Sequence, residues 1–186
     1  HAFRERVQQL GFNLDDEQVN VAFAEFKKLA DRKKDMFDGD IEAIIMNAES
    51  GGEGPWEMAE LHISAGTGAI AAAAVRLRHA DGRTVDEASV GDGPVEASFK
   101  ALERATGINL DLKNFEVRSV TVGEDAQGEV TVTVDYNGQS HRGHGVSTDI
   151  VEAGALAYLE VINRVCRQAA GRSALASAAG DNVVRL

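Results

Sequence analysis

Two glycine-rich segments of the sequence are the residues best suited to binding a ligand. Gly91-Asp92-Gly93-Pro94 follows a strand pattern and opens a helix pattern, and Gly145-Val146-Ser147-Thr148-Asp149 occupies the same kind of position later in the chain. Unpaired N–H groups and the helix dipole at such a place attract an anion, including a carboxylate. No Gly-Lys-Ser/Thr follows, so neither segment is a nucleotide-binding P-loop. A tight turn that requires glycine is the alternative interpretation.

The side chains that usually perform catalysis are sparse and poorly arranged. His141 and His144 are three residues apart in a strand pattern, and the neighbours Asp86 and Glu87 also lie in a strand pattern. Because strand side chains alternate between faces, neither pair converges on one point. A zinc site needs three or four ligands, and Cys166 is the only cysteine. We therefore expect no metal site, no acid–base pair and no disulfide framework.

The charge balance narrows the possible partners. The 186 residues include 19 Lys and Arg and 30 Asp and Glu, a formal net charge of -11. Nucleic-acid binding and docking on an anionic membrane both need basic surfaces. No apolar run is long enough to span a bilayer. We expect a cytoplasmic protein in a reducing compartment. Because the chain begins at His1 rather than Met, we also expect it to start inside a longer protein or after processing.

The spacing of apolar residues divides the chain into segments. Residues 1–48 show helical spacing and predict a small three-helix linker subdomain. Residues 49–57, with Gly51-Gly52 as a hinge and Pro55 at the end, predict a flexible linker. Residues 58–168 form the next domain, and the Ala/Ser/Gly-rich residues 169–186 predict a C-terminal tail.

An internal repeat sets the expected fold of residues 58–168. Pro94-Val95-Glu96-Ala97 matches Ile150-Val151-Glu152-Ala153 at an offset of 56, and the hairpin glycines Gly82 and Gly138 match at the same offset. Before each helix pattern the apolar residues alternate with polar ones, which is typical of strands. We predict an α+β fold of two pseudo-symmetric βββα units, with antiparallel sheets and helices on one face.

Three motifs in this order and spacing resemble the C-terminal regulatory domain of 2-isopropylmalate synthases. The motifs are Gly91-Asp92-Gly93-Pro94-Val95-Glu96-Ala97, then the segment 123–130, then Gly143-His144-Gly145-Val146-Ser147-Thr148-Asp149-Ile150. The resemblance covers roughly residues 58–166. Residues 1–48 resemble the helical linker subdomain of the same enzymes.

The resemblance implies a regulatory role for the chain. Those enzymes condense acetyl-CoA with 2-oxoisovalerate in an N-terminal (β/α)8 barrel that uses a divalent metal, and this chain lacks the barrel. The resemblance therefore implies a fragment without catalytic activity or a cofactor of its own. It also implies a homodimer, contact with the barrel of the same protein, and leucine as the feedback inhibitor.

The leucine site carried over from the resemblance is small and apolar, as a branched aliphatic ligand requires. The Gly91-Asp92-Gly93 loop would meet the polar end of the amino acid. Phe115 replaces a Tyr of some relatives, and Ser119 and Thr148 are more polar than in others. The residues implied are Gly91, Asp92, Gly93, Val95, Leu112, Phe115, Ser119, Ala126, Gly128, Thr148 and Ile150. Val95, Leu112 and Ile150 would equally suit ordinary core packing.

The sequence leaves three further functions open. Citramalate synthases share this type of domain and sense isoleucine, which differs from leucine by one methyl position. Discrimination of that size is worth only about 1–3 kcal/mol, so a few pocket side chains decide it. The second function is that of a purely structural dimerisation module. The third is that of an independent small enzyme, although the sequence contains no convergent nucleophile and base for one.

Overall fold

The computed structural model describes residues 1–31, 35–49, 54–119 and 126–180. The three N-terminal helices are α1 (Ala2–Gln9), α2 (Asp16–Ala30) and α3 (Asp38–Glu49), as the sequence predicts. They form the helical subdomain, whose own core contains Val7, Phe12, Ala22, Ile41, Ile44 and Ile45. The Asp15 side chain accepts a hydrogen bond from the Gln18 backbone amide, and the Gln18 side chain accepts one from the Asp15 backbone amide. This capping box starts α2.

The first βββα unit follows. Its strands β1 (Trp56–Ser64), β2 (Ala71–His79) and β3 (Thr84–Gly91) form an antiparallel sheet in that order, and α4 (Pro94–Thr106) completes the unit. Gly82 turns the β2–β3 hairpin with a φ of +94°. Gly107 ends α4 in the left-handed conformation and donates its amide to the Glu103 carbonyl, which satisfies one open end of the helix.

The second unit repeats this topology. Strands β4 (Asp111–Ser119), β5 (Gly128–Tyr136) and β6 (Gln139–Ser147) form an antiparallel sheet in that order, followed by α5 (Ile150–Gly180). Asn137 and Gly138 both have positive φ, at 50° and 76°, which fits the two-residue hairpin expected of an Asn-Gly pair. The predicted α+β fold with two βββα units is confirmed.

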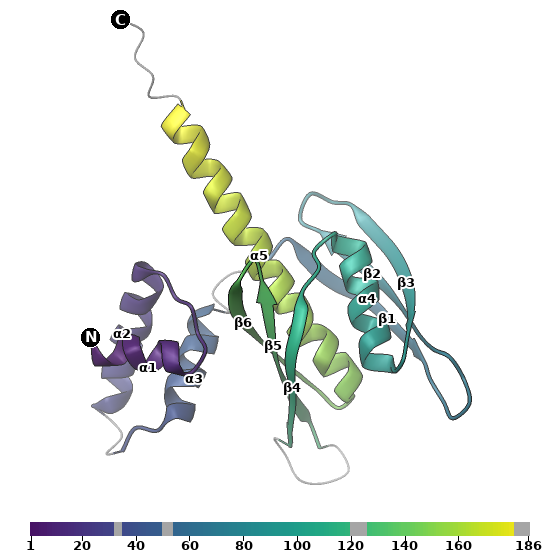
Figure 1. Ribbon diagram of the computed structural model, residues 1–186, viewed down its shortest axis with the longest axis horizontal. Coiled ribbons are helices and arrows are strands. Elements are labelled where there is room, and N and C mark those ends of the chain that lie inside the picture. Colours follow the sequence, from purple (N-terminus) through teal and green to yellow (C-terminus); the bar gives the residue numbers. More distant parts are fainter. Residues whose placement is uncertain (32–34, 50–53, 120–125, 181–186) are drawn as a thin grey trace, which may run out of the picture.

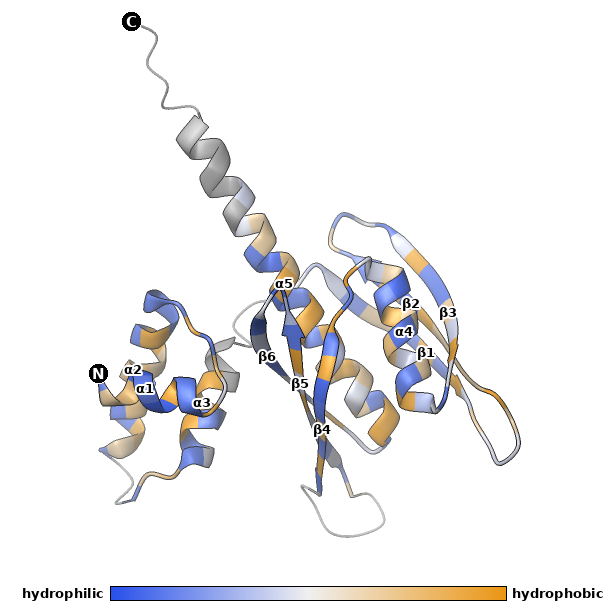
Figure 2. Cartoon of the chain, viewed as in Figure 1, coloured by the Kyte–Doolittle hydropathy of each residue, from blue (hydrophilic) through white to orange (hydrophobic). Residues whose placement is uncertain are grey.

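Both sheets bury one face against the helices. Ala73, Val75 and Leu77 of β2 and Val130, Val132 and Val134 of β5 are buried at alternate positions. The alternation of hydrophobic and hydrophilic residues along the strands is visible in Figure 2. The helices contact each other as well, and the Phe99 ring of α4 stacks on the Tyr158 ring of α5 with centroids 4.0 Å apart. The two units therefore share one core.

The two helices begin at the same end of this double unit (Figure 1). Phe99 lies against Gly154 and Tyr158, and the next turn of α4 brings Glu103 to the Tyr158 hydroxyl. The contacts thus advance in the same direction along both helices. This arrangement places the ends of β3, β4 and β6 near the two helix starts.

Two segment boundaries differ from the sequence-based expectation. The segment from residue 169, expected to be a tail, is helical instead, because α5 continues to Gly180. The alanines of that segment are strong helix formers and extend the helix. The first strand begins at Trp56, inside the expected linker, because Trp56 pairs with His79 of β2; the Asn163 side chain bonds the amide and the carbonyl of Trp56 as well. The expected hinge at Gly51-Gly52 lies outside the described residues.

No helix in the described parts of the chain has the length and apolar character needed to cross a bilayer.

Candidate ligand-binding site

The start of α4 has no side-chain cap. Gly93 is the N-cap residue with extended backbone, at φ −150° and ψ 172°, and Pro94 follows as the first helical residue. The Asp92 amide donates to the Glu96 carboxylate at 2.8 Å. Lys100, 2.5 Å from Glu96, and then the Asp92 amide hold the pKa of Glu96 below its usual value. The loop is therefore held at Asp92, while no side chain caps the first N–H groups of the helix.

The two glycines of this loop have different reasons to be glycine. A Cβ on Gly91 would lie 2.6 Å from the backbone nitrogen of Ala97, so α4 packs directly on the strand end there. A Cβ on Gly93 would meet nothing within 4 Å. The turn-and-packing interpretation therefore applies to Gly91, whereas Gly93 leaves open space in front of the helix. Gly93 is the position where a ligand could approach.

The start of α5 is built differently at the equivalent place. Asp149, 56 residues after Gly93, accepts hydrogen bonds from the amides of Val151 at 2.8 Å and Glu152 at 3.4 Å. Its own carboxylate therefore occupies the anion position of this helix. Beside it Ile150 is 40% exposed, and a Cβ on Gly128 would lie 3.2 Å from the Ile150 side chain. Gly128 thus makes room for an exposed apolar side chain.

Most of the residues implied by the resemblance gather at the end of the fold where both helices begin. Ser119 is the register partner of Gly128, which also pairs with Ser147 next to Thr148 and Ile150. Ala126 precedes Gly128 in the chain. Val95 packs against the common core in the first turn of α4. The loop Gly91–Gly93, Val95, Ser119, Ala126, Gly128, Thr148 and Ile150 therefore belong to one end of the domain (Figure 1).

Phe115 and Leu112 occupy other parts of β4. Phe115 lies mid-strand, where a Cβ on Gly154 would lie 3.0 Å from its ring and its ring centroid is 6.2 Å from that of Phe99. Leu112 pairs with Val134, seven residues before Ser119 along the same strand. At about 3.3 Å per residue this separation is about 23 Å. The structure therefore does not bring Leu112 to the helix starts, where the other residues gather.

Val117 is an apolar residue at this end that the resemblance did not include. It lies between Phe115 and Ser119, pairs with the buried Val130, and is nevertheless 45% exposed. The alternation of β4 in the sequence gives the signal that could have found it, since Phe115, Val117 and Ser119 share one face. Val117 and Ile150 together form the exposed apolar part of the candidate site.

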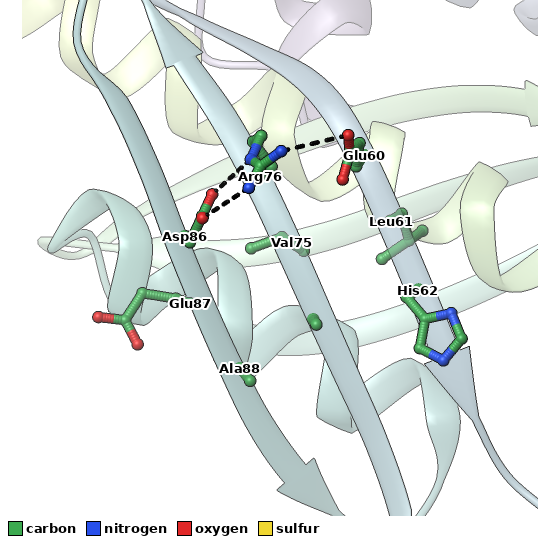
Figure 3. Close-up of a pocket in the computed structure, with 9 residues that line it drawn as sticks. Glu60, Leu61, His62, Val75, Arg76, Asp86, Glu87 and Ala88 are labelled. Atoms are coloured by element: carbon green, nitrogen blue, oxygen red, sulfur yellow. Dashed lines mark hydrogen bonds and ion pairs between the residues drawn. The ribbon is translucent and has the colours of Figure 1, made fainter.

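A hollow lies on the outer face of the first sheet, away from the helix starts. It has a volume of about 630 Å³ and a floor of strand residues that includes Ala74 and Ala88. Arg76 crosses it and pairs with Asp86 at 2.7 Å and Glu60 at 3.3 Å (Figure 3). The hydrogen bond from Arg76 lowers the pKa of Asp86. One guanidinium thus lies between two carboxylates, which leaves this part of the groove net negative, and the groove contains none of the residues implied by the resemblance.

The described residues hold no group of three His, Cys, Asp or Glu side chains arranged for a metal ion. His144 instead pairs with Glu129 across the strands at 2.7 Å, and His79 pairs with Asp81 at 3.0 Å. The structure therefore places each of these histidines beside a single carboxylate.

Comparison with known proteins identifies the family. A model described as "LeuA allosteric (dimerisation) domain" matches residues 35–166, which is most of the chain. The chain belongs to this family. It is 44% identical over 167 residues to 2-isopropylmalate synthase of Pyrococcus furiosus, a match covering 90% of the chain and 33% of the relative. The corresponding enzyme of Heliobacterium modesticaldum is 43% identical over 165 residues, covering 89% and 32%.

The family match supports the resemblance deduced from the motifs. The 2-isopropylmalate synthase of Ruminiclostridium cellulolyticum is 45% identical over 164 residues, covering 88% of the chain and 32% of the relative. The chain thus spans about a third of the length of these relatives. The LeuA allosteric domain of this chain extends over both βββα units and back into α3.

Proposed function

We propose that the chain is the regulatory region of a 2-isopropylmalate synthase and binds L-leucine at the end of the fold where α4 and α5 begin. The observation that carries this proposal is the uncapped start of α4 at Gly93, at the same end of the fold as the exposed Val117 and Ile150, in a chain of the LeuA allosteric family. An amino acid with a branched aliphatic side chain needs both features. It carries a carboxylate for the helix N-terminus and an apolar group for the strand face.

The chemistry of the site suits the two ends of such a ligand. The carboxylate would accept hydrogen bonds from the first amides of α4, and the exposed Asp92 carboxylate would attract the ammonium group. The side chain of the ligand would lie against Val117 and Ile150, and Gly128 makes room for the Ile150 side chain. Phe115 would close the pocket from the middle of β4 and offers no hydroxyl to a ligand.

The role in the complete enzyme follows from the same proposal. Leucine is the end product that would inhibit condensation of acetyl-CoA with 2-oxoisovalerate in a (β/α)8 barrel with a divalent metal. This chain contains no such barrel and would be inactive alone, without a cofactor of its own. It would also form the homodimer that the family description implies. Inhibition requires that leucine bind two arrangements of the dimer with different affinities.

Calorimetric titration of the chain with leucine and isoleucine tests the proposal. Saturable leucine binding that is clearly tighter than isoleucine binding is the expected result. Two variants at one position sharpen the test. Gly93→Asp would place a carboxylate at the α4 start, as Asp149 does at α5, and should weaken leucine binding by more than about tenfold. Gly93→Ala adds no charge and meets no neighbouring atom, so it should bind leucine nearly as well.

Different results would point to different functions. Preference for isoleucine would assign the chain to an isoleucine-sensing citramalate synthase. A folded dimer that binds neither amino acid would be a structural dimerisation module. Equal leucine affinity of wild type and Gly93→Asp would leave a leucine sensor but contradict the α4 start as the carboxylate site.

A further inference from the structure

Arg142 connects the second unit to the helical subdomain. It lies in the middle of β6, and its side chain is only 17% exposed. Its guanidinium donates to the Leu10 carbonyl at 3.2 Å, lies 3.4 Å from the Glu42 carboxylate and sits 5.2 Å from the centroid of the Phe12 ring. Leu10 and Phe12 lie between α1 and α2 and Glu42 belongs to α3, so one side chain contacts two separate segments of the helical subdomain.

The backbone of Arg142 is fixed from the opposite side. The Arg164 guanidinium of α5 donates to the Arg142 carbonyl at 2.6 Å, and its other nitrogen donates to Glu160 at 3.2 Å. Arg164 is almost completely buried. Arg142 is therefore held between the helical subdomain and α5, and a shift of α5 or β6 would move its guanidinium.

Both elements that hold Arg142 begin or end at the candidate ligand site. β6 runs five residues from Arg142 to Ser147, and α5 starts at Ile150. His144, on the same side of β6 as Arg142, pairs with Glu129 beside Gly128. Coupling between distant sites travels through hydrogen-bond networks and rigid secondary elements, and β6 and α5 supply such a continuous connection from Gly128 and Ile150 to Arg142.

We infer that Arg142 is the positioning residue that transmits the state of the ligand site to the helical subdomain. The inference rests on the proposed function, because it assigns the route by which bound leucine would act on the rest of the enzyme. Arg142 touches neither the ligand site nor a reacting group. Its replacement should therefore uncouple regulation and leave leucine binding in place.

The two sheets provide a matched control. Arg76 also lies on the outer face of a sheet, but it pairs with Asp86 and Glu60 of its own sheet and reaches no helix of the subdomain in these contacts. Asp86 occupies the position in β3 that Arg142 occupies in β6, 56 residues later. Arg76→Met thus removes a sheet-face guanidinium without touching the proposed connection.

The experiment uses the full-length enzyme and this chain in parallel, with Arg142→Met, Glu42→Gln and Arg76→Met. In the full-length enzyme, Arg142→Met should raise the leucine concentration for half inhibition by at least about fivefold, within the range of typical allosteric couplings. Glu42→Gln, which only weakens the contact, should give a smaller shift in the same direction. Arg76→Met should be inhibited like wild type, and activity without leucine should be unchanged in all three.

In this chain, calorimetry should give leucine affinities within about threefold of wild type for all three variants. Hydrogen exchange then separates transmission from binding. Leucine should change the exchange of amides in α1 and α3 of wild type and Arg76→Met, but not of Arg142→Met. Undiminished inhibition of Arg142→Met by leucine would overturn the inference while leaving the proposed function intact. Failure of the wild-type chain to bind leucine would overturn the proposed function and the inference with it.

Discussion

The two βββα units share a topology but differ where their helices begin. In the first unit Gly93 starts α4 without a side-chain cap, whereas in the second Asp149 at the matching position binds the amides of Val151 and Glu152. A carboxylate from the chain thus occupies in one unit the position that is open in the other. The repeat teaches that two units of one topology can differ in whether the chain itself fills the anion position at the start of the helix.

The strands that precede these helices differ as well. Gly143 and Gly145 of β6 let α5 approach so closely that a Cβ on either would lie 2.1 Å from a backbone oxygen of the helix. The matching residues of β3 are Glu87 and Ser89. The second unit is therefore the tighter one, and we expect substitutions at equivalent positions to have unequal effects.

Gly145→Ala should have the largest effect on stability. The added Cβ would contact the Ala153 carbonyl oxygen and the Ala157 nitrogen, which are backbone atoms that cannot rotate away. We expect a loss of about 3 kcal/mol in the free energy of unfolding, at the upper end for overpacking. Alanine at the equivalent position of the first unit, Ser89→Ala, should lower the free energy of unfolding by less than about 1 kcal/mol. Urea unfolding measures both, and equal losses would contradict the difference in packing.

Tyr158→Phe should have the next largest effect. The Tyr158 hydroxyl donates to Glu103 and lies 3.3 Å from the Leu110 carbonyl, whereas the matching residue of the first unit is the apolar Leu102. Removal of the hydroxyl leaves partly buried acceptors without their donor. We expect a loss of about 1–2 kcal/mol at neutral pH, measured by urea unfolding.

The same tyrosine predicts a pH dependence. Burial, and next the hydrogen bond with Glu103, raise the pKa of Tyr158 above its usual value. The native state therefore holds this proton more tightly than the unfolded chain, whose tyrosines ionise near pH 10. The stabilisation is complete below that pH and decreases as the pH rises above it. Unfolding measured from about pH 8 to 11 should show this decrease in wild type and a smaller one in Tyr158→Phe.

The sequence predicted the fold well because the repeat supplied the same pattern twice. The alternation in β2 and β5 and the hairpin glycines Gly82 and Gly138 are local signals, and the structure contains each of them. The continuation of α5 was missed because its alanine-rich end has no apolar stripe to distinguish a helix from a tail. At the early start of β1, Trp56 pairs with His79 and bonds to Asn163, 107 residues away in the chain, and no local pattern reveals these contacts.

The candidate site was harder to predict than the fold. The helix starts were found because glycine and proline at these positions have a local meaning. The different roles of Gly91 and Gly93 depend on how closely α4 packs on the strand end, and only the three-dimensional structure gives that distance. Leu112 and Val117 are both apolar residues of β4. Their positions along the strand decide which of them lies near the helix starts.

The smallest expected effects come from exchanging the two helix caps. Asp149→Ala removes the acceptor for two amides of α5 and should lower the free energy of unfolding by about 1 kcal/mol. Gly93→Asp supplies such an acceptor to α4 without steric conflict and should raise it by a few tenths of a kcal/mol. Urea unfolding measures both changes: with an unchanged m-value, Asp149→Ala should lower the midpoint and Gly93→Asp should raise it. If Gly93→Asp instead destabilised the chain, the α4 start would not be the open anion position, because a carboxylate there would lack the N–H donors on which both the cap and the leucine carboxylate depend.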